Sequence, residues 1–124
     1  MILKRRKRER MNVRPPERVD CKPHLQWVRG HDCVVANSTF PLGRGVTCDG
    51  RIEAHHVRVS GEGTTGKKPG DDKVVSLCVA HHIAGHRSGW RSFEERYRVD
   101  LTAIAAALWK QSPHRIKWEQ KNEQ

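Results

Sequence analysis

The sequence predicts a single small α+β domain in which two short strands are followed by helices. Residues 51–59 show an imperfect two-residue alternation of apolar side chains, and residues 73–77 form a short apolar run, as strands do. The intervening segment is rich in glycine and polar residues, which predicts a loop. Apolar residues at helical spacing follow as far as Pro113. A chain of 124 residues with this order fits one domain.

The remaining elements follow from local composition. Residues 1–20 are basic and lack apolar periodicity, so we expect a flexible arm that contacts phosphates or, alternatively, an uninvolved tail. Residues 22–33 form a short helical or extended element that enters the core, and residues 33–49 form a loop. Helices are expected at 79–87, 91–98 and 101–111, the last capped by Asp100. The domain then spans 21–113, and 114–124 are expected to form a polar tail that frays.

The charge balance favours a polyanionic partner. Lys and Arg number 24 against 14 Asp and Glu, which gives a net charge of +10 and a pI near 10.0. Such an excess suits nucleic acid, although a basic solubility surface or a membrane-attracted patch is the plainer alternative. The expected phosphate-binding residues are Lys4, Arg5, Arg6, Lys7, Arg8, Lys67 and Lys68.

The chain carries no sequence signal for export or for crossing a membrane. No apolar run approaches the roughly 18 residues needed for a span. The basic N-terminal block has no apolar segment behind it, unlike a secretory signal. We therefore expect a cytoplasmic protein without a membrane partner, whose four cysteines stay reduced and are available to a metal.

A structural zinc site is expected, because only 35% of the residues are hydrophobic and a small core needs added stabilisation from a disulfide or a metal. Cys78 and His81 form a C-x-x-H pair across a strand-to-helix turn, a spacing that lets both reach one ion. Cys33 and Cys48 are the expected partners, with Cys21 as the spare. The alternative is that these are small buried residues without a metal.

A second group of histidines favours a second ion. His82 and His86 stand at i and i+4 and so share a helix face, whereas His81 points about 100° away. His55 and His56 are neighbours in a strand and face opposite sides unless a bulge intervenes. One of them can bind a metal while the other acts as a general base. The plainer alternative is a set of solvent-facing histidines.

The loop at residues 61–68 is not expected to bind a nucleotide cofactor. Gly61, Gly66 and Lys67 match most of the phosphate-binding pattern G-x-x-x-x-G-K-[ST]. Lys68 replaces the hydroxyl that would hold magnesium, and the Pro69–Gly70 pair prevents the helix that should follow.

A strand with HH, a loop, a strand ending in LC and a helix with H-x-x-x-H together resemble the HNH, or ββα-metal, endonucleases, in particular their small phage and prophage members. The resemblance runs from His24 to Pro113, and GTTGKKPGDDKVVSLCVAHH is its most specific stretch. It implies that His56 is the general base and that His82 and His86 hold one divalent ion. It further implies that His55 is an additional ligand of that ion.

The resemblance also implies that Arg58, two residues beyond the expected base, could bind a phosphate oxygen. Other positions depart from the family pattern. Lys73 stands where the family has an asparagine that orients the base, so Asp72 or a backbone carbonyl would have to substitute. In addition, fourteen residues separate Cys33 from Cys48, the first cysteine pair of the expected zinc site, and His81 replaces a cysteine.

The expected function is metal-dependent hydrolysis of DNA phosphodiester bonds, with RNA left open. The cofactors are a structural Zn²⁺ and one divalent ion, Zn, Ni, Mn or Mg, at the active site; an all-imidazole site favours transition ions. A zinc-stabilised nucleic-acid-binding accessory protein without catalysis is the alternative, and a protein–protein adaptor is the third. The sequence leaves the oligomeric state unknown.

Overall fold

The computed structural model describes residues 18–36, 46–58 and 69–122, and within these ranges it contains two strands and five helices. Strands β1 (Ile52–His56) and β2 (Val74–Cys78) pair antiparallel, with Ile52 opposite Cys78 and His56 opposite Val74. The predicted α+β class is confirmed. The expected phosphate-binding residues at 4–8 and 67–68 lie outside the described ranges.

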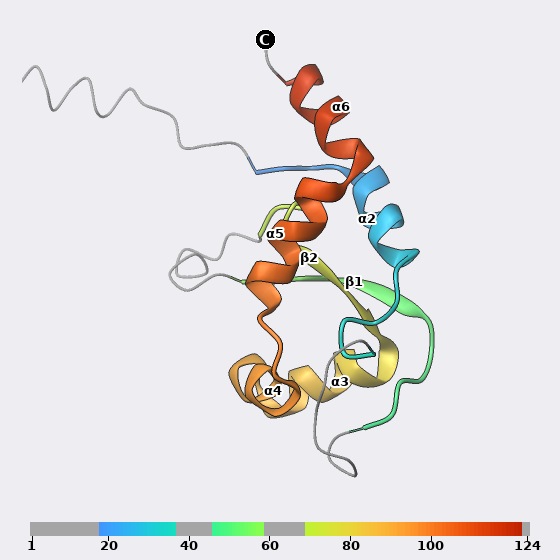
Figure 1. Cartoon of the computed structure of the whole chain (residues 1–124), viewed down its shortest axis with the longest axis vertical. Coiled ribbons are helices and arrows are strands. Elements are labelled where there is room, and N and C mark those ends of the chain that lie inside the picture. The colour runs from blue at the N-terminus through green and yellow to red at the C-terminus, as the bar shows by residue number, and fades with distance from the viewer. Residues whose placement is uncertain (1–17, 37–45, 59–68, 123–124) are drawn as a thin grey trace, which may run out of the picture.

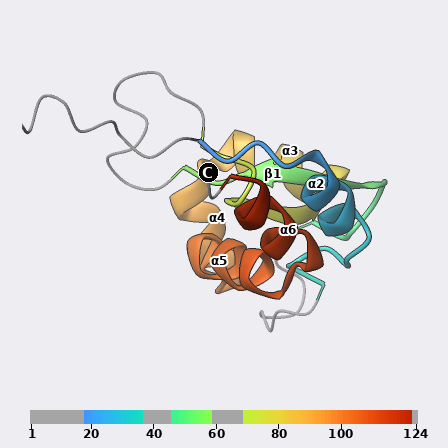
Figure 2. The same ribbon diagram turned by 90° about the horizontal axis from the view of Figure 1, so that it is seen from above.

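Three helices contact the strand pair, and the other two described helices pack against those three. Helix α2 (Lys22–Arg29) precedes β1, and α3 (Val79–Ser88) begins at the residue after β2. The chain continues through α4 (Trp90–Tyr97), α5 (Leu101–Gln111) and α6 (Pro113–Lys121). Figure 1 shows α3 and α4 together at one end of the molecule and α6 at the other, with α5 running between them. The view from above shows α2 beside α6 (Figure 2).

The core lies between the sheet and the helices that cover it. All five residues of β2 are buried, as expected for a strand enclosed on both sides. Phe93 and Tyr97 of α4 and Leu101 of α5 belong to the same core cluster as side chains of β2. The fully buried side chains include Val28, Val35, Val74, Val75, Leu77, Phe93, Tyr97 and Leu101. This core is small. The β2–α3 junction, at Cys78, lies at the edge of the core.

Two expectations about the ends of the domain differ from the structure. Residues 113–121, expected within and next to a fraying tail, form α6, whose N-cap Ser112 accepts a hydrogen bond from the His114 N–H. Residues 18–20, assigned to the flexible arm, are fastened to the chain, since Val19 O accepts a hydrogen bond from the Asp71 N–H at 2.8 Å. Among the described residues, no helix combines the length and apolar character that a bilayer span requires.

Candidate functional site

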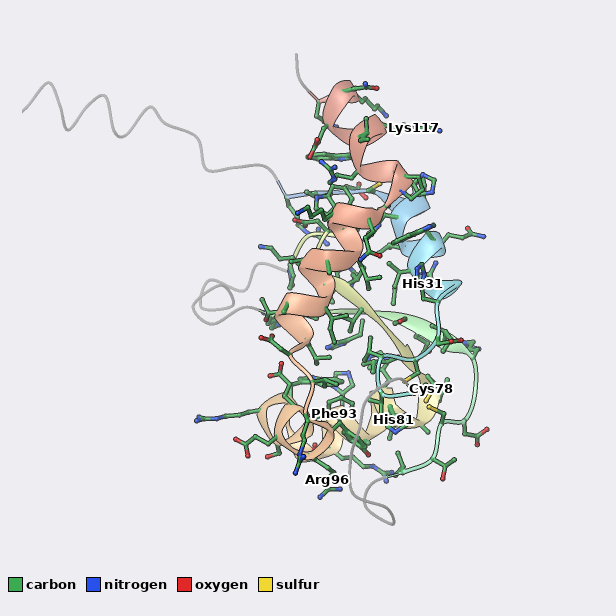
Figure 3. The ribbon with its side chains drawn as sticks, viewed as in Figure 1. His31, Cys78, His81, Phe93, Arg96 and Lys117 are labelled. Atoms are coloured by element: carbon green, nitrogen blue, oxygen red, sulfur yellow. The ribbon has the colours of Figure 1, made fainter. Side chains whose placement is uncertain are left out.

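The junction between β2 and α3 carries the first candidate site. Cys78 is both the last residue of β2 and the N-cap of α3, and its Sγ accepts the His81 N–H at 3.4 Å. This cap satisfies one of the free N–H groups at the start of the helix. It also brings the two members of the C-x-x-H pair onto one turn, as the sequence predicts. Figure 3 shows Cys78 and His81 at the α3–α4 end of the molecule.

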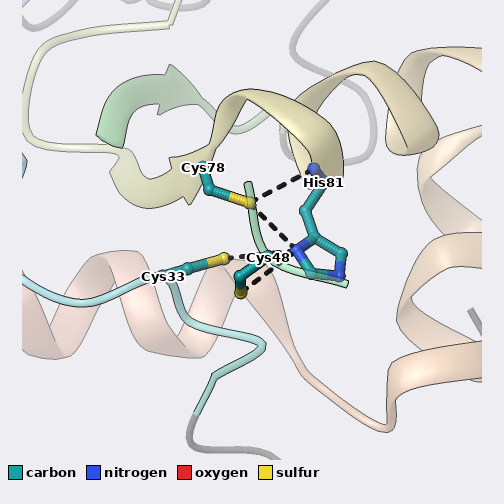
Figure 4. Close-up of side chains that lie close together, drawn as sticks. All are labelled: Cys33, Cys48, Cys78 and His81. Atoms are coloured by element: carbon teal, nitrogen blue, oxygen red, sulfur yellow. Dashed lines mark hydrogen bonds between the residues drawn. The ribbon is translucent and has the colours of Figure 1, made fainter. Parts of the chain in front are cut away.

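Three cysteine sulfurs surround one ring nitrogen at this junction. Figure 4 shows the sulfurs of Cys33, Cys48 and Cys78 on one side of the His81 ring; Cys33 comes from the segment after α2 and Cys48 from the segment before β1. His81 Nδ1 lies 3.1 Å from the Sγ of Cys78, 3.5 Å from that of Cys48 and 3.7 Å from that of Cys33. A tetrahedral ion with ordinary Zn–S and Zn–N lengths separates sulfur from nitrogen by about 3.6 Å. The Cys33, Cys48, Cys78 and His81 group could therefore hold a metal such as zinc.

The protonation states of this group suit a cation. His81 Nε2–H donates to Val46 O at 2.9 Å, so the Nδ1 lone pair faces the sulfurs. Burial together with the neighbouring Cys33 and Cys78 thiols raises the pKa of Cys48 to about 12. Burial also acts to raise the pKa of Cys78, but hydrogen bonds led by that from the His81 N–H outweigh it and lower the pKa. Cys78 is thus easier to ionise than Cys48, and a positive charge among the sulfurs would favour the thiolate form of each.

The fourth cysteine lies apart from this group. Cys21 is buried at the N-terminus of α2, and its N–H donates to Asp71 Oδ2 at 2.9 Å. Its sulfur is not a member of the metal-competent cluster. Cys33, rather than the spare Cys21, is therefore the residue that completes the quartet.

The second candidate site lies on the next helical face of α3. His55, His82 and His86 each present a ring nitrogen, and these nitrogens lie within 4.8 Å of one another. His81 and His82 are neighbours in sequence but serve different clusters, because a helix rotates successive side chains by about 100°. Burial, followed by the nearby His82 and His86, lowers the pKa of His55 to about 4. The ring is therefore neutral near pH 7, the form that binds metals.

Two residues that sequence reasoning missed hold these rings in place. Glu53 Oε1 accepts from His82 Nδ1 at 2.8 Å, which leaves His82 Nε2 as the ligand atom. The signal was available, because Glu53 precedes His55 by two residues and so shares its strand face. The Trp90 ring stacks on His55 with centroids 4.1 Å apart and contacts His86 edge-on. Nothing in the local pattern indicated this tryptophan.

His56 contacts a different carboxylate. Its Nε2 lies 2.8 Å from Asp71 Oδ1, and Asp71 is 6% exposed. Asp72, expected as a substitute for the missing asparagine, makes no hydrogen bond to His56 in the described part of the chain. The backbone carbonyl of Lys73 accepts a hydrogen bond from the Val57 N–H at 2.7 Å. The carboxylate that contacts His56 is therefore that of Asp71, one residue before the expected Asp72.

One groove joins the second histidine cluster to His56. It has a volume of about 610 Å³ and runs from the histidine rings of β1 and α3 to the start of α5. Arg58, expected to contact phosphate, lines it and is exposed. Arg18, which sequence reasoning did not single out, lines it from the other segment and donates from Nε to Pro69 O at 3.0 Å. Two cations and four imidazoles thus share one open cavity.

Comparison with known proteins adds no relative: no family model, curated protein or solved structure matches this chain.

Proposed function

We propose that the protein is a metal-dependent endonuclease of the HNH, or ββα-metal, kind that hydrolyses DNA phosphodiester bonds. The observation that carries the proposal is the groove in which the His55, His82 and His86 cluster lies beside the carboxylate-bonded His56. Hydrolysis of a phosphodiester needs a proton acceptor for water and a cation for the phosphate. The groove offers candidates for both.

The residues divide the work as follows. His56 accepts a proton from the attacking water, and Asp71 stabilises the charge that the ring then carries. Arg58 and Arg18 bind non-bridging phosphate oxygens at the rim of the groove. The positive charge of the chain raises the local concentration of the polyanion.

The three imidazoles of His55, His82 and His86 would hold one divalent ion through their ring nitrogens. When bound, that ion neutralises the phosphate and stabilises the leaving oxygen. Nitrogen ligands favour Zn, Ni or Mn over Mg. The Cys33, Cys48, Cys78 and His81 quartet is closed by four protein ligands and has a structural role.

Substitution of the base tests this function. We expect His56→Ala to lower the rate of supercoiled plasmid nicking by about 10²- to 10⁴-fold, because the water loses its proton acceptor. The assay includes Mn²⁺, Mg²⁺, Ni²⁺ and Zn²⁺ in turn. His31→Ala is the matched control, since His31 lies outside the groove and contacts Trp27. Equal nicking by the wild type and His56→Ala would reject His56 as the base.

Lys73, at the position where the family has an asparagine, favours a second candidate, a nucleic-acid-binding accessory protein without catalysis. That reading predicts DNA binding without nicking under every ion, with an affinity that falls steeply with salt. Salt-insensitive or absent DNA binding would instead favour a protein adaptor.

A further inference from the structure

His56 and Asp71 form a dyad that is fixed on both sides. Asp71 Oδ1 lies 2.8 Å from His56 Nε2, and Asp71 Oδ2 accepts the Cys21 N–H at 2.9 Å. The aspartate side chain is 8% exposed, whereas that of His56 is 34% exposed and lines the groove. The carboxylate is thus enclosed, and the ring that it contacts reaches the solvent side.

Backbone pairing between two short segments fixes the aspartate. The Asp71 N–H donates to Val19 O at 2.8 Å, and Arg18 Nε donates to Pro69 O at 3.0 Å. Gly70 permits this approach, because a Cβ there would lie 2.9 Å from Val19 N. Rotation of the Asp71 side chain away from His56 would also break its bond to the Cys21 N–H.

The donor at Cys21 determines what the aspartate can do for the histidine. A main-chain N–H is always a donor, so Asp71 Oδ2 must accept. Burial acts to raise the pKa of Asp71, but the hydrogen bonds with His56 and the Cys21 N–H, together with nearby positive charge, outweigh it and lower the pKa. The carboxylate is therefore ionised near neutral pH. An ionised carboxylate only accepts, and His56 Nε2 must therefore carry the hydrogen.

We propose that Asp71 is the positioning residue of the site: it holds His56 as the Nε2–H tautomer and leaves the Nδ1 lone pair as the proton acceptor of the groove. The role in catalysis rests on the proposed nuclease function, whereas the tautomer does not. Residues 18–21 contribute to this positioning, because their backbone fixes the Asp71 carboxylate.

Asp71→Asn is the decisive variant, since it keeps the shape and removes one acceptor. The amide oxygen accepts from the Cys21 N–H, so the NH₂ group faces His56 Nε2, which must then accept a hydrogen bond. The ring proton moves to Nδ1, the atom that has to stay free. Asp72→Asn is the matched control, because the neighbouring carboxylate makes no hydrogen bond to His56 in the described chain.

The experiment combines nitrogen-15 NMR of the histidine rings with plasmid nicking kinetics on the full chain. We expect an Nε2–H His56 in the wild type and in Asp72→Asn, and an Nδ1–H His56 in Asp71→Asn. In Asp71→Asn we expect kcat to fall by about 10²- to 10⁴-fold with little change in KM, since the base is in the wrong tautomer.

The outcomes separate the inference from the proposed function. An Nδ1–H His56 in the wild type, or an unchanged tautomer in a folded Asp71→Asn, overturns the positioning role whatever the activity. A reversed tautomer with undiminished nicking overturns Nδ1 as the proton acceptor. A wild type that nicks under no ion but shows the expected tautomers rejects the nuclease and leaves the assignment of Asp71 intact.

Discussion

His24 is the residue whose burial is hardest to reconcile with its chemistry. It is 0% exposed on α2, and neither ring nitrogen has a hydrogen-bond partner. The Trp27 ring stacks on it at 5.6 Å, and the Trp109 ring meets it edge-on at 4.9 Å. Burial, followed by repulsion from His114, lowers its pKa from 6.5 to about 4. The ring is therefore held neutral among aromatic side chains.

This burial predicts a specific loss of stability in acid. Between pH 6.5 and about 4 the unfolded chain binds a proton at His24 that the native chain does not bind. The free energy of unfolding therefore decreases as the pH falls through this window, by at most about 3 kcal/mol from this residue. In His24→Leu, the free energy of unfolding, measured by denaturant unfolding, should decrease less between pH 7 and pH 4.5 than it does in the wild type. Other groups also titrate there, so the prediction concerns the difference between wild type and variant; parallel curves would contradict it.

At the residue scale, sequence predicts ligands better than the groups that orient them. The C-x-x-H pair and the i, i+4 histidines follow from local geometry, and the structure brings each set together. Asp71 and Glu53 act across turns and strands, so their partners depend on tertiary pairing that spacing does not encode. Asp71 and Asp72 are equivalent in sequence, and only the backbone pairing with Val19 selects the first.

The packing of α3 against α4 is the element-scale feature that shapes the histidine cluster. A Cβ on Gly85 would lie 2.0 Å from Trp90 Cζ3 and 2.1 Å from Cη2, so α3 has room for the indole only because this residue is glycine. Trp90 in turn stacks on His55. The contact between the two helices therefore sets the position of a candidate metal ligand.

Gly85→Ala is expected to displace Trp90 and to destabilise the fold by about 1–3 kcal/mol, as overpacking does. Trp90→Phe removes the clashing ring atoms, so the double variant should lose less stability than the sum of the two single variants. Denaturant unfolding of the four proteins measures this coupling, and Ni²⁺ titration followed by calorimetry measures its effect on the histidine cluster. Additive stability losses would contradict the contact.

Helix α6 shows where pattern reading fails at this scale. Its sequence is polar, and none of its residues is buried, so apolar periodicity gave no signal. The helix nonetheless begins with Ser112 as N-cap and Pro113 in its first turn, which are ordinary start signals. Its Trp118 packs edge-on to Trp109 of α5. Strand β2 and the helix at 101–111 were predictable because their apolar residues face the core.

At the scale of the whole molecule, the small core leads us to expect that the fold depends on a metal at the quartet of Cys33, Cys48, Cys78 and His81. Two strands and short helices bury few large side chains, and the three thiols converge from both loops and β2. Zinc binding at closed sites contributes on the order of 10 kcal/mol, which becomes folding free energy when the site forms only in the native state. We therefore expect a metal bound at the quartet to substitute for apolar burial.

Cys78→Ser should abolish metal binding at the quartet and with it cooperative thermal unfolding. Cys21→Ser is the matched control: it alters a buried cysteine outside the quartet, so it should keep the metal and cost about 1 kcal/mol. His82→Ala should lose only the ion of the histidine cluster. Mass spectrometry of metal content, with calorimetric melting, measures each effect. Loss of both ions in His82→Ala, or retention of zinc in Cys78→Ser, would contradict two independent sites.

The adjacency of His81 and His82 on α3 has a mechanical consequence. One ring is anchored among sulfurs and the other among imidazoles, so a single rotation of α3 about its axis would misalign both. Cys78 holds that rotation at the first turn, and Trp90 opposes it from the side. Inserting one residue between His81 and His82 would turn the imidazole face away by about 100° while the sulfur-bound end stays in place. The fold therefore has to keep the rotation of α3 about its own axis constant.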